Sequence, residues 1–142
     1  AFVDYAHSPD SVTRVLETAK AFTAGKVIAV LGCGGDRDVT KRPLMGAALS
    51  NGSDIAIFTS DNPRSEAPQV ILDSMTAGLK VSAPSKVIEN RSSAIEYAVS
   101  LAKPGDTVLL LGKGHEIGQE IAGVIHSFDD RIELARVIEG KS

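Results

Sequence analysis

The protein has 142 residues, of which 43% are hydrophobic and 23% are charged, and its net charge is -3. That length suits one globular domain with its own core. The sequence contains no basic block and no basic-aromatic ladder, so nucleic acid is a poor candidate partner. No apolar run approaches the roughly 18 residues of a membrane span, no signal-peptide pattern opens the chain, and Cys33 is the single cysteine. We therefore expect a cytoplasmic protein with no membrane partner.

Short apolar runs alternate with segments of helical spacing. Strands are predicted at 2–5, 26–31, 54–60, 86–89 and 107–111. Between and after them lie helices for which Ser8, Ser65, Asn90 and Asp129 are the expected N-caps. The stretch 119–128 alternates and is broken by Gly123, which predicts a hairpin. The predicted fold is α/β, with a Rossmann-like open, mostly parallel sheet of about six strands flanked by helices and an antiparallel hairpin near the C-terminus.

The loops after four of these strands hold most of the unusual residues. If the sheet is parallel, the loops that follow Tyr5, Leu31, Ser60 and Leu111 lie at one edge, where open α/β sheets bind ligands. One of them, 61–64, reads Asp-Asn-Pro-Arg, and its proline stiffens the backbone. We expect the polar side chains of these loops to converge.

Two of the converging loops are rich in glycine. Residues 32–37 fail the dinucleotide pattern G-x-G-x-x-G/A because Arg37 stands where Gly or Ala is needed, and no Walker A motif occurs in the chain. Each loop, 32–38 and 112–116, is either a flexible connector or a segment whose backbone approaches a ligand. His7 and His115 lie in converging loops and favour a functional reading, whereas Cys33 and His126 favour a structural one. No spacing indicates a metal site held by this chain alone.

The charges on these loops are mixed. Arg37 and Arg64 are cations, and Asp61 and Glu116 are anions. Arginine forks suit carboxylates, and acids suit ammonium groups, so a zwitterionic ligand such as an amino acid fits better than a plain phosphate.

Four motifs in one order carry a family resemblance. They are D-Y-A-H-S-P-D at 4–10, G-G-D-R-D at 34–38 followed by K-R-P at 41–43, D-N-P-R at 61–64 and G-K-G-H-E at 112–116. Residues 1–142 as a whole resemble the C-terminal domain of the Mur ligases, in particular the members that add 2,6-diaminopimelate.

The resemblance implies an ATP-dependent, amide-forming ligase of peptidoglycan synthesis. In that family ATP phosphorylates the acceptor carboxylate of a UDP-N-acetylmuramoyl dipeptide, and the amine of the incoming amino acid attacks the acyl phosphate. The residues implied to bind meso-diaminopimelate are Arg37, Asp61, Asn62, Pro63, Arg64, Gly112 and Glu116. Asp4 and His7 are implied to face the nucleotide. No catalytic residue and no metal ligand is assigned to this chain.

Much of such a ligase would lie elsewhere. The resemblance implies that the N-terminal and central domains, with the P-loop and the Mg2+ ligands, are absent from these residues, so that ATP and Mg2+ are bound mainly by the missing central domain. We expect a fragment that folds but is inactive alone. Two alternatives stay open: a non-catalytic α/β module that binds an amino acid or nucleotide, and a related ligase that uses L-lysine. Arg64 distinguishes a diaminopimelate-adding ligase from a lysine-adding one, since L-lysine lacks the distal carboxylate.

Overall fold

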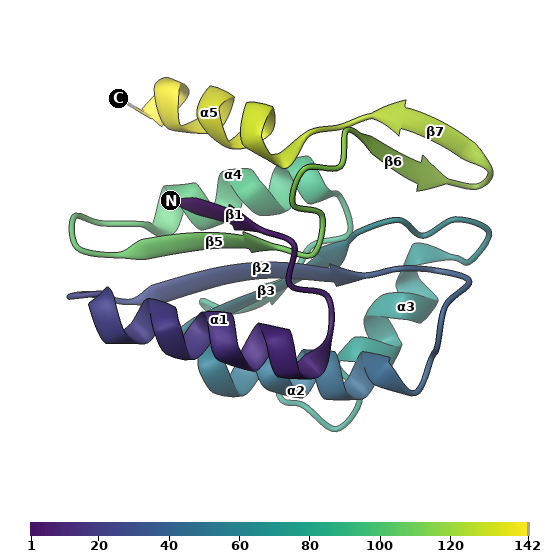
Figure 1. Ribbon diagram of the computed structural model, residues 1–142, viewed down its shortest axis with the longest axis horizontal. Coiled ribbons are helices and arrows are strands. Elements are labelled where there is room, and N and C mark those ends of the chain that lie inside the picture. The colour runs from purple at the N-terminus through teal and green to yellow at the C-terminus, as the bar shows by residue number, and fades with distance from the viewer. Residues whose placement is uncertain (142) are drawn as a thin grey trace.

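A computed structural model describes residues 1–141 as one α/β unit with a three-layer core (Figure 1). The strands are β1 (Phe2–Asp4), β2 (Val27–Cys33), β3 (Ile55–Ser60), β4 (Lys86–Val87), β5 (Thr107–Leu111), β6 (Gly118–Ile121) and β7 (Val124–Ser127). The helices are α1 (Pro9–Phe22), α2 (Lys41–Gly52), α3 (Pro68–Met75), α4 (Arg91–Leu101) and α5 (Asp130–Lys141). None of these helices is long and apolar enough to cross a membrane.

The main sheet is entirely parallel and has five strands, in the order β1-β5-β2-β3-β4. Its register aligns Leu31 with both Phe58 and Leu111, so the three central strands end close together. All five strands run in the same direction, and in Figure 1 the arrows of β1, β5 and β2 lead to one edge. The predicted fold class is confirmed, with five strands in the sheet and β6 and β7 in a separate antiparallel pair.

Two hydrophobic layers cover the sheet, because alternate side chains of each buried strand face opposite sides. Ala29, Leu31 and Phe58 pack with helices α1, α2 and α3. Val30 and Ile57 point the other way and pack with α4 and α5. Figure 1 shows α4 and α5 on one side of the sheet and α1 and α2 on the other. Both faces of the sheet are therefore covered, and only the loops at the strand ends can bring polar side chains of the sheet to a ligand.

Most of the predicted helix starts are confirmed. The Ser8 side chain accepts from the backbone N–H of Ser11, and Asn90 accepts from Ser93. The Asp129 carboxylate accepts from the backbone N–H of Arg131 at 2.9 Å. These bonds satisfy N–H groups that the first turn of a helix leaves free.

The prediction for Ser65 was wrong. Helix α3 begins at Pro68, its N-cap is Ala67, and no side chain caps it. Ser65 instead donates through its hydroxyl to the Asp36 carboxylate at 2.5 Å, and its backbone N–H donates there at 3.2 Å. The Ser65 side chain therefore bonds a residue that is distant in sequence and does not cap the helix, although the local pattern had predicted that it would.

The hairpin of β6 and β7 turns at Ala122 and Gly123, both with positive φ. Its β6 strand does not join the main sheet but contacts the loop after β3. The backbone N–H of Arg64 donates to the Glu120 carbonyl at 2.8 Å, and the N–H of Ala122 donates to the Arg64 carbonyl at 2.7 Å. The hairpin thus forms a wall beside the edge where the strands end.

Candidate ligand-binding site

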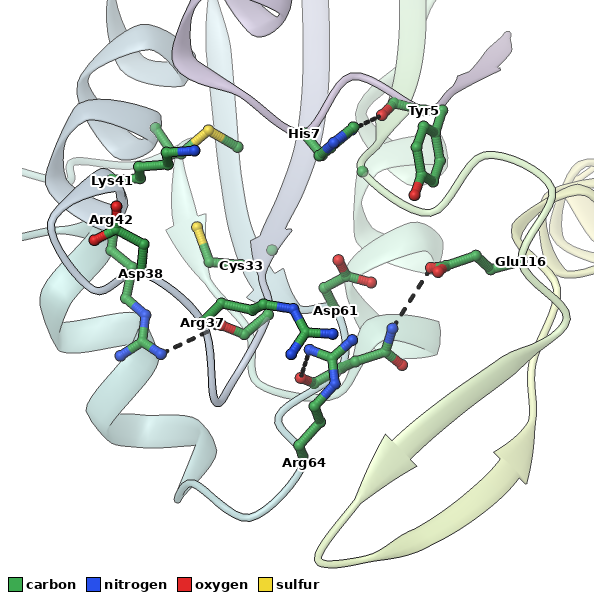
Figure 2. Close-up of a pocket in the computed structure, with 15 residues that line it drawn as sticks. Tyr5, His7, Cys33, Arg37, Asp38, Lys41, Arg42, Asp61, Arg64 and Glu116 are labelled. Atoms are coloured by element: carbon green, nitrogen blue, oxygen red, sulfur yellow. Dashed lines mark hydrogen bonds between the residues drawn. The ribbon is translucent and has the colours of Figure 1, made fainter.

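A pocket of about 420 Å³ lies at the carboxyl edge of the sheet. The loops after β1, β2, β3 and β5 all contribute to it, as the strand pattern predicted. The lining residues named by the sequence are His7, Arg37, Asp61, Asn62, Arg64, Gly112 and Glu116. Figure 2 shows Asp61 and Glu116 on one side of the pocket, with the side chains of Arg37 and Arg64 directed toward a common point near Asp61.

Arg64 occupies an unusual backbone conformation, with a φ of 54°. Non-glycine residues seldom adopt this left-handed region, so tertiary contacts must hold it. Its backbone is bonded on both sides to the hairpin, and Nη1 donates to the Gly35 carbonyl at 2.9 Å and to the Asn62 carbonyl at 3.4 Å. Arg64 Nε lies 3.9 Å from Glu120 Oε1. The guanidinium is therefore fixed in the pocket while part of it stays open to a ligand.

The glycine-rich loop lies directly against the 61–64 loop. A Cβ at Gly35 would stand 1.8 Å from the carbonyl oxygen of Pro63, and a Cβ at Gly34 would stand 2.8 Å from Arg64 Nη1. Glycine at 35 therefore permits the close approach of two backbones, and glycine at 34 leaves room for the Arg64 guanidinium. Arg37 extends from the same loop and is exposed, and within residues 1–141 its guanidinium donates only to the Asp36 carbonyl, at 3.1 Å.

Arg42 anchors this loop from below. Its buried guanidinium makes a bidentate pair with Glu66, at 2.5 and 3.1 Å, and donates to the Gly34 carbonyl at 3.2 Å. The hydrogen bonds from Arg42 and from the backbone N–H of Asp36 hold the pKa of Glu66 below its usual value. The K-R-P motif at 41–43 did not predict this role for Arg42, because its partner Glu66 lies 24 residues away in the sequence.

The sequence did not predict that Lys113 is buried beside the polar residues of the site. Its side chain is fully buried and its ammonium donates to the Gly118 carbonyl at 2.7 Å. It also lies 3.4 Å from Asn62 Oδ1, 3.5 Å from Asp61 Oδ1 and 3.6 Å from Glu116 Oε1. A lysine between two glycines reads as exposed in sequence, and nothing local indicates its burial.

A second buried cation supports the floor of the site. Arg91 forms a fully buried pair with Asp130 and donates to the carbonyls of Ser60 and Leu111, each at 3.1 Å. Burial opposes its charge, but the hydrogen bonds and charge of Asp130 outweigh burial and raise the pKa of Arg91. The two carbonyls stand at the ends of β3 and β5, so this arginine ties together the strands that carry the site.

Asp4, Pro63 and Cys33 support the site without offering a polar group to a ligand. Asp4 is not among the lining residues; its carboxylate accepts from the backbone N–H of Ala6 at 2.8 Å and shapes the loop that carries His7. Pro63 is buried and supplies backbone packing against Gly35 rather than a pocket surface. Cys33 lines the pocket, but burial and the nearby Asp61 carboxylate raise the pKa of its thiol to about 12, despite the opposing charge of Arg42. The thiol is therefore a packed side chain and not a nucleophile.

These features define a class of protein: a Rossmann-like α/β domain with a zwitterion-compatible pocket at the carboxyl ends of its parallel strands. The family model described as Mur ligase, glutamate ligase domain matches residues 1–114. This chain belongs to that family.

Sequence relatives agree with the family assignment. The UDP-N-acetylmuramoyl-L-alanyl-D-glutamate–2,6-diaminopimelate ligase of Streptomyces avermitilis is 54% identical over 145 residues, which cover 98% of this chain and 28% of that protein. The protein with the same name from Caulobacter vibrioides is 52% identical over 141 residues, covering 99% and 28%. The chain thus spans little more than a quarter of the length of the curated relatives it matches.

Solved structures support the fold. A structure of UDP-N-acetylmuramoyl-L-alanyl-D-glutamate–2,6-diaminopimelate ligase matches with a TM-score of 0.93 and 46% identity, over 98% of this chain and 29% of that one. E. coli FolC in complex with ADP matches with a TM-score of 0.57 at 24% identity, over 98% and 28%. The second likeness concerns the fold alone.

Proposed function

We propose that this chain is the amino-acid-binding domain of a longer ATP-dependent ligase that adds meso-2,6-diaminopimelate to UDP-N-acetylmuramoyl-L-alanyl-D-glutamate in peptidoglycan synthesis. The observation that carries the proposal is the pairing of two arginines, Arg37 and Arg64, with two acids, Asp61 and Glu116, around one pocket. meso-Diaminopimelate has two carboxylates and two amino groups, and this arrangement is complementary to it. The printed names of the relatives support the same ligand.

The domain's contribution is recognition of the nucleophile. Arg37 and Arg64 would bind the carboxylates, and Asp61, Asn62 and Glu116 would bind an ammonium group. Gly112 has a φ of 104°, which side chains rarely adopt, and it lies beside the acid, because a Cβ there would stand 3.7 Å from Asp61 Oδ2. Holding the amino acid in one orientation brings its reacting amine to the activated carboxylate supplied from elsewhere in the ligase.

This chain offers a candidate contact to ATP but no P-loop for its phosphates. His7 lines the upper side of the pocket with Tyr5 and is a candidate to face the nucleotide, with Asp4 holding its loop. The sequence contains no P-loop. Within residues 1–141, no three His, Cys, Asp or Glu side chains gather where they could hold a metal ion. We therefore assign both groups mainly to the rest of the ligase, and propose that the isolated domain performs no ligation.

Steady-state kinetics of the full-length ligase test this function. We expect the wild type to use meso-diaminopimelate far better than L-lysine, because L-lysine leaves an arginine without its carboxylate. Arg64→Ala is expected to lower kcat/KM for meso-diaminopimelate by about a hundredfold, the cost of a lost charge-assisted hydrogen-bond pair, with an unchanged KM for ATP. Arg136→Ala, an exposed arginine on α5, is the matched control. Equal use of the two amino acids by the wild type would favour the lysine-adding alternative instead.

A further inference from the structure

We propose that Lys113 is a positioning residue for amino-acid binding, whose buried ammonium orients the carboxylates of Asp61 and Glu116 toward the pocket. This inference rests on the proposed function and deepens it, since it explains how the acidic side of the site is held ready for an ammonium group. Lys113 does not line the pocket, so it acts through the two acids and not by touching the substrate.

The contacts of Lys113 connect three separate segments. Its ammonium donates to Gly118 at the start of the hairpin and lies within 3.6 Å of side-chain oxygens from the loop after β3 and of Glu116 in its own loop. Asn62 completes the link: Nδ2 donates to Glu116 Oε1 at 3.5 Å, and Oδ1 accepts from the backbone N–H of Glu120 at 2.9 Å. The acids are thereby held by a network of hydrogen bonds and ion pairs around one buried ammonium.

Each acid contributes one oxygen to this network. Asp61 Oδ1 and Glu116 Oε1 face the lysine. Asp61 Oδ2 lies on the side of Gly112, a pocket-lining residue. Among residues 1–141, Glu116 Oε2 has no hydrogen-bond partner. The remaining oxygens are therefore available to a ligand, and Figure 2 shows Asp61 and Glu116 on one side of the pocket.

Charge explains why a lysine is needed at this point. The carboxylates of Asp61 and Glu116 both lie close to this ammonium, and without the cation their like charges would push the two groups apart. A buried ammonium is in turn retained only when acids and carbonyls compensate it. Lys113 and the two acids therefore depend on one another, and a neutral residue at this position would leave the acids without the cation that orients them.

The test compares three variants of the full-length ligase. Lys113→Met removes the charge and keeps most of the unbranched length, Lys113→Arg keeps the charge, and Lys103→Met alters an exposed lysine at the opposite edge. We expect Lys113→Met to raise the KM for meso-diaminopimelate by about tenfold or more, with the KM for ATP unchanged. Lys113→Arg is expected to recover most of the loss, and Lys103→Met to match the wild type.

A purely structural role would give a different result. It would change the KM for both substrates alike, and arginine would not restore amino-acid binding. Either that pattern or an unchanged KM for meso-diaminopimelate in Lys113→Met overturns the inference. If Lys113→Met does not fold, Lys113→Met/Asp61→Asn is expected to restore the melting temperature, since it removes an uncompensated acid; failure to do so also overturns it.

Failure of the proposed function is recognised separately. A wild-type enzyme that does not use meso-diaminopimelate contradicts the proposed function without bearing on Lys113. The same three variants are then measured with the amino acid that the wild type accepts. Lys113→Met is again expected to raise the KM for that amino acid by about tenfold or more and to leave the KM for ATP unchanged.

Discussion

Arg91 and Asp130 form an ion pair that is closed to solvent on both sides, with Nη2 and Oδ2 2.6 Å apart and Nε and Oδ1 2.8 Å apart. The pair joins α4 to the first turn of α5. The same guanidinium donates to carbonyls at the ends of β3 and β5, directly beneath the loops of the pocket. One side chain thus links the packing of the outer helix layer to the edge that carries the site.

Removing one partner of this pair is expected to destabilise the fold strongly. Arg91→Met leaves Asp130 buried and unpaired and two carbonyls without a donor, and it should lower the free energy of unfolding by about 3–5 kcal/mol. Urea denaturation measures the loss. Lys20→Met, which breaks an exposed pair with Asp54, should cost at most about 1 kcal/mol. Similar losses for the two variants would contradict the role given to the buried pair.

The close contact between Gly35 and Pro63 predicts that adding one methyl group at Gly35 would push two loops of the site apart. Gly35→Ala would place Cβ against the Pro63 carbonyl oxygen, and the loops must part to admit it. We expect a loss of about 1–3 kcal/mol in stability, together with weaker binding of meso-diaminopimelate by the full-length enzyme. Thermal melting and calorimetry measure the two effects. Gly140→Ala, a site in α5 where nothing lies within 4 Å, is the control and should leave binding unchanged and stability unchanged or slightly higher; a Gly35 variant that behaves like it would disprove the contact.

The raised pKa of Cys33 predicts a pH dependence of stability. The thiol keeps its proton in the folded state up to about pH 12, whereas its ordinary value is 9.0. The folded state therefore binds more protons than the unfolded state in this window, and stability decreases as pH rises from about 9 to 12. The slope is at most about 1.4 kcal/mol per pH unit.

Urea denaturation of the wild type and of Cys33→Ala at pH 8, 9 and 10 isolates this contribution, because all other titrating groups are shared. The difference between the two proteins should be constant below pH 9 and should shrink above it. Parallel curves across the whole range would show that the thiol is not protected. A thiol reagent is expected to react slowly with the native protein at pH 8 and rapidly once urea unfolds it.

Much of the fold follows from local patterns. The alternation of buried apolar runs with helical spacing predicted each strand of the sheet, and capping residues such as Ser8 and Asn90 marked helix starts correctly. The failure at Ser65 has a clear reason: its hydroxyl bonds Asp36, 29 residues away, and helix α3 starts after it. Local preference is overridden where a tertiary partner offers a better hydrogen bond.

The site was partly predictable for a related reason. Parallel strands bring their following loops to one edge, so the convergence of Arg37, Asp61, Arg64 and Glu116 could be inferred from chain order. The burial of Lys113 and the docking of the hairpin could not, since both depend on contacts between segments far apart in the sequence.

The sequence by itself determined the sheet, its two apolar faces and the identity of the polar residues at its edge, because periodicity and turn chemistry are local properties of the chain. Only the tertiary structure decided which of those residues face a ligand and which support others. Arg42, Arg91 and Lys113 are buried with partners 24, 39 and 52 residues away. Whether a charged side chain meets solvent, substrate or a buried acid depends on packing across the whole domain, and no short stretch of sequence contains that information.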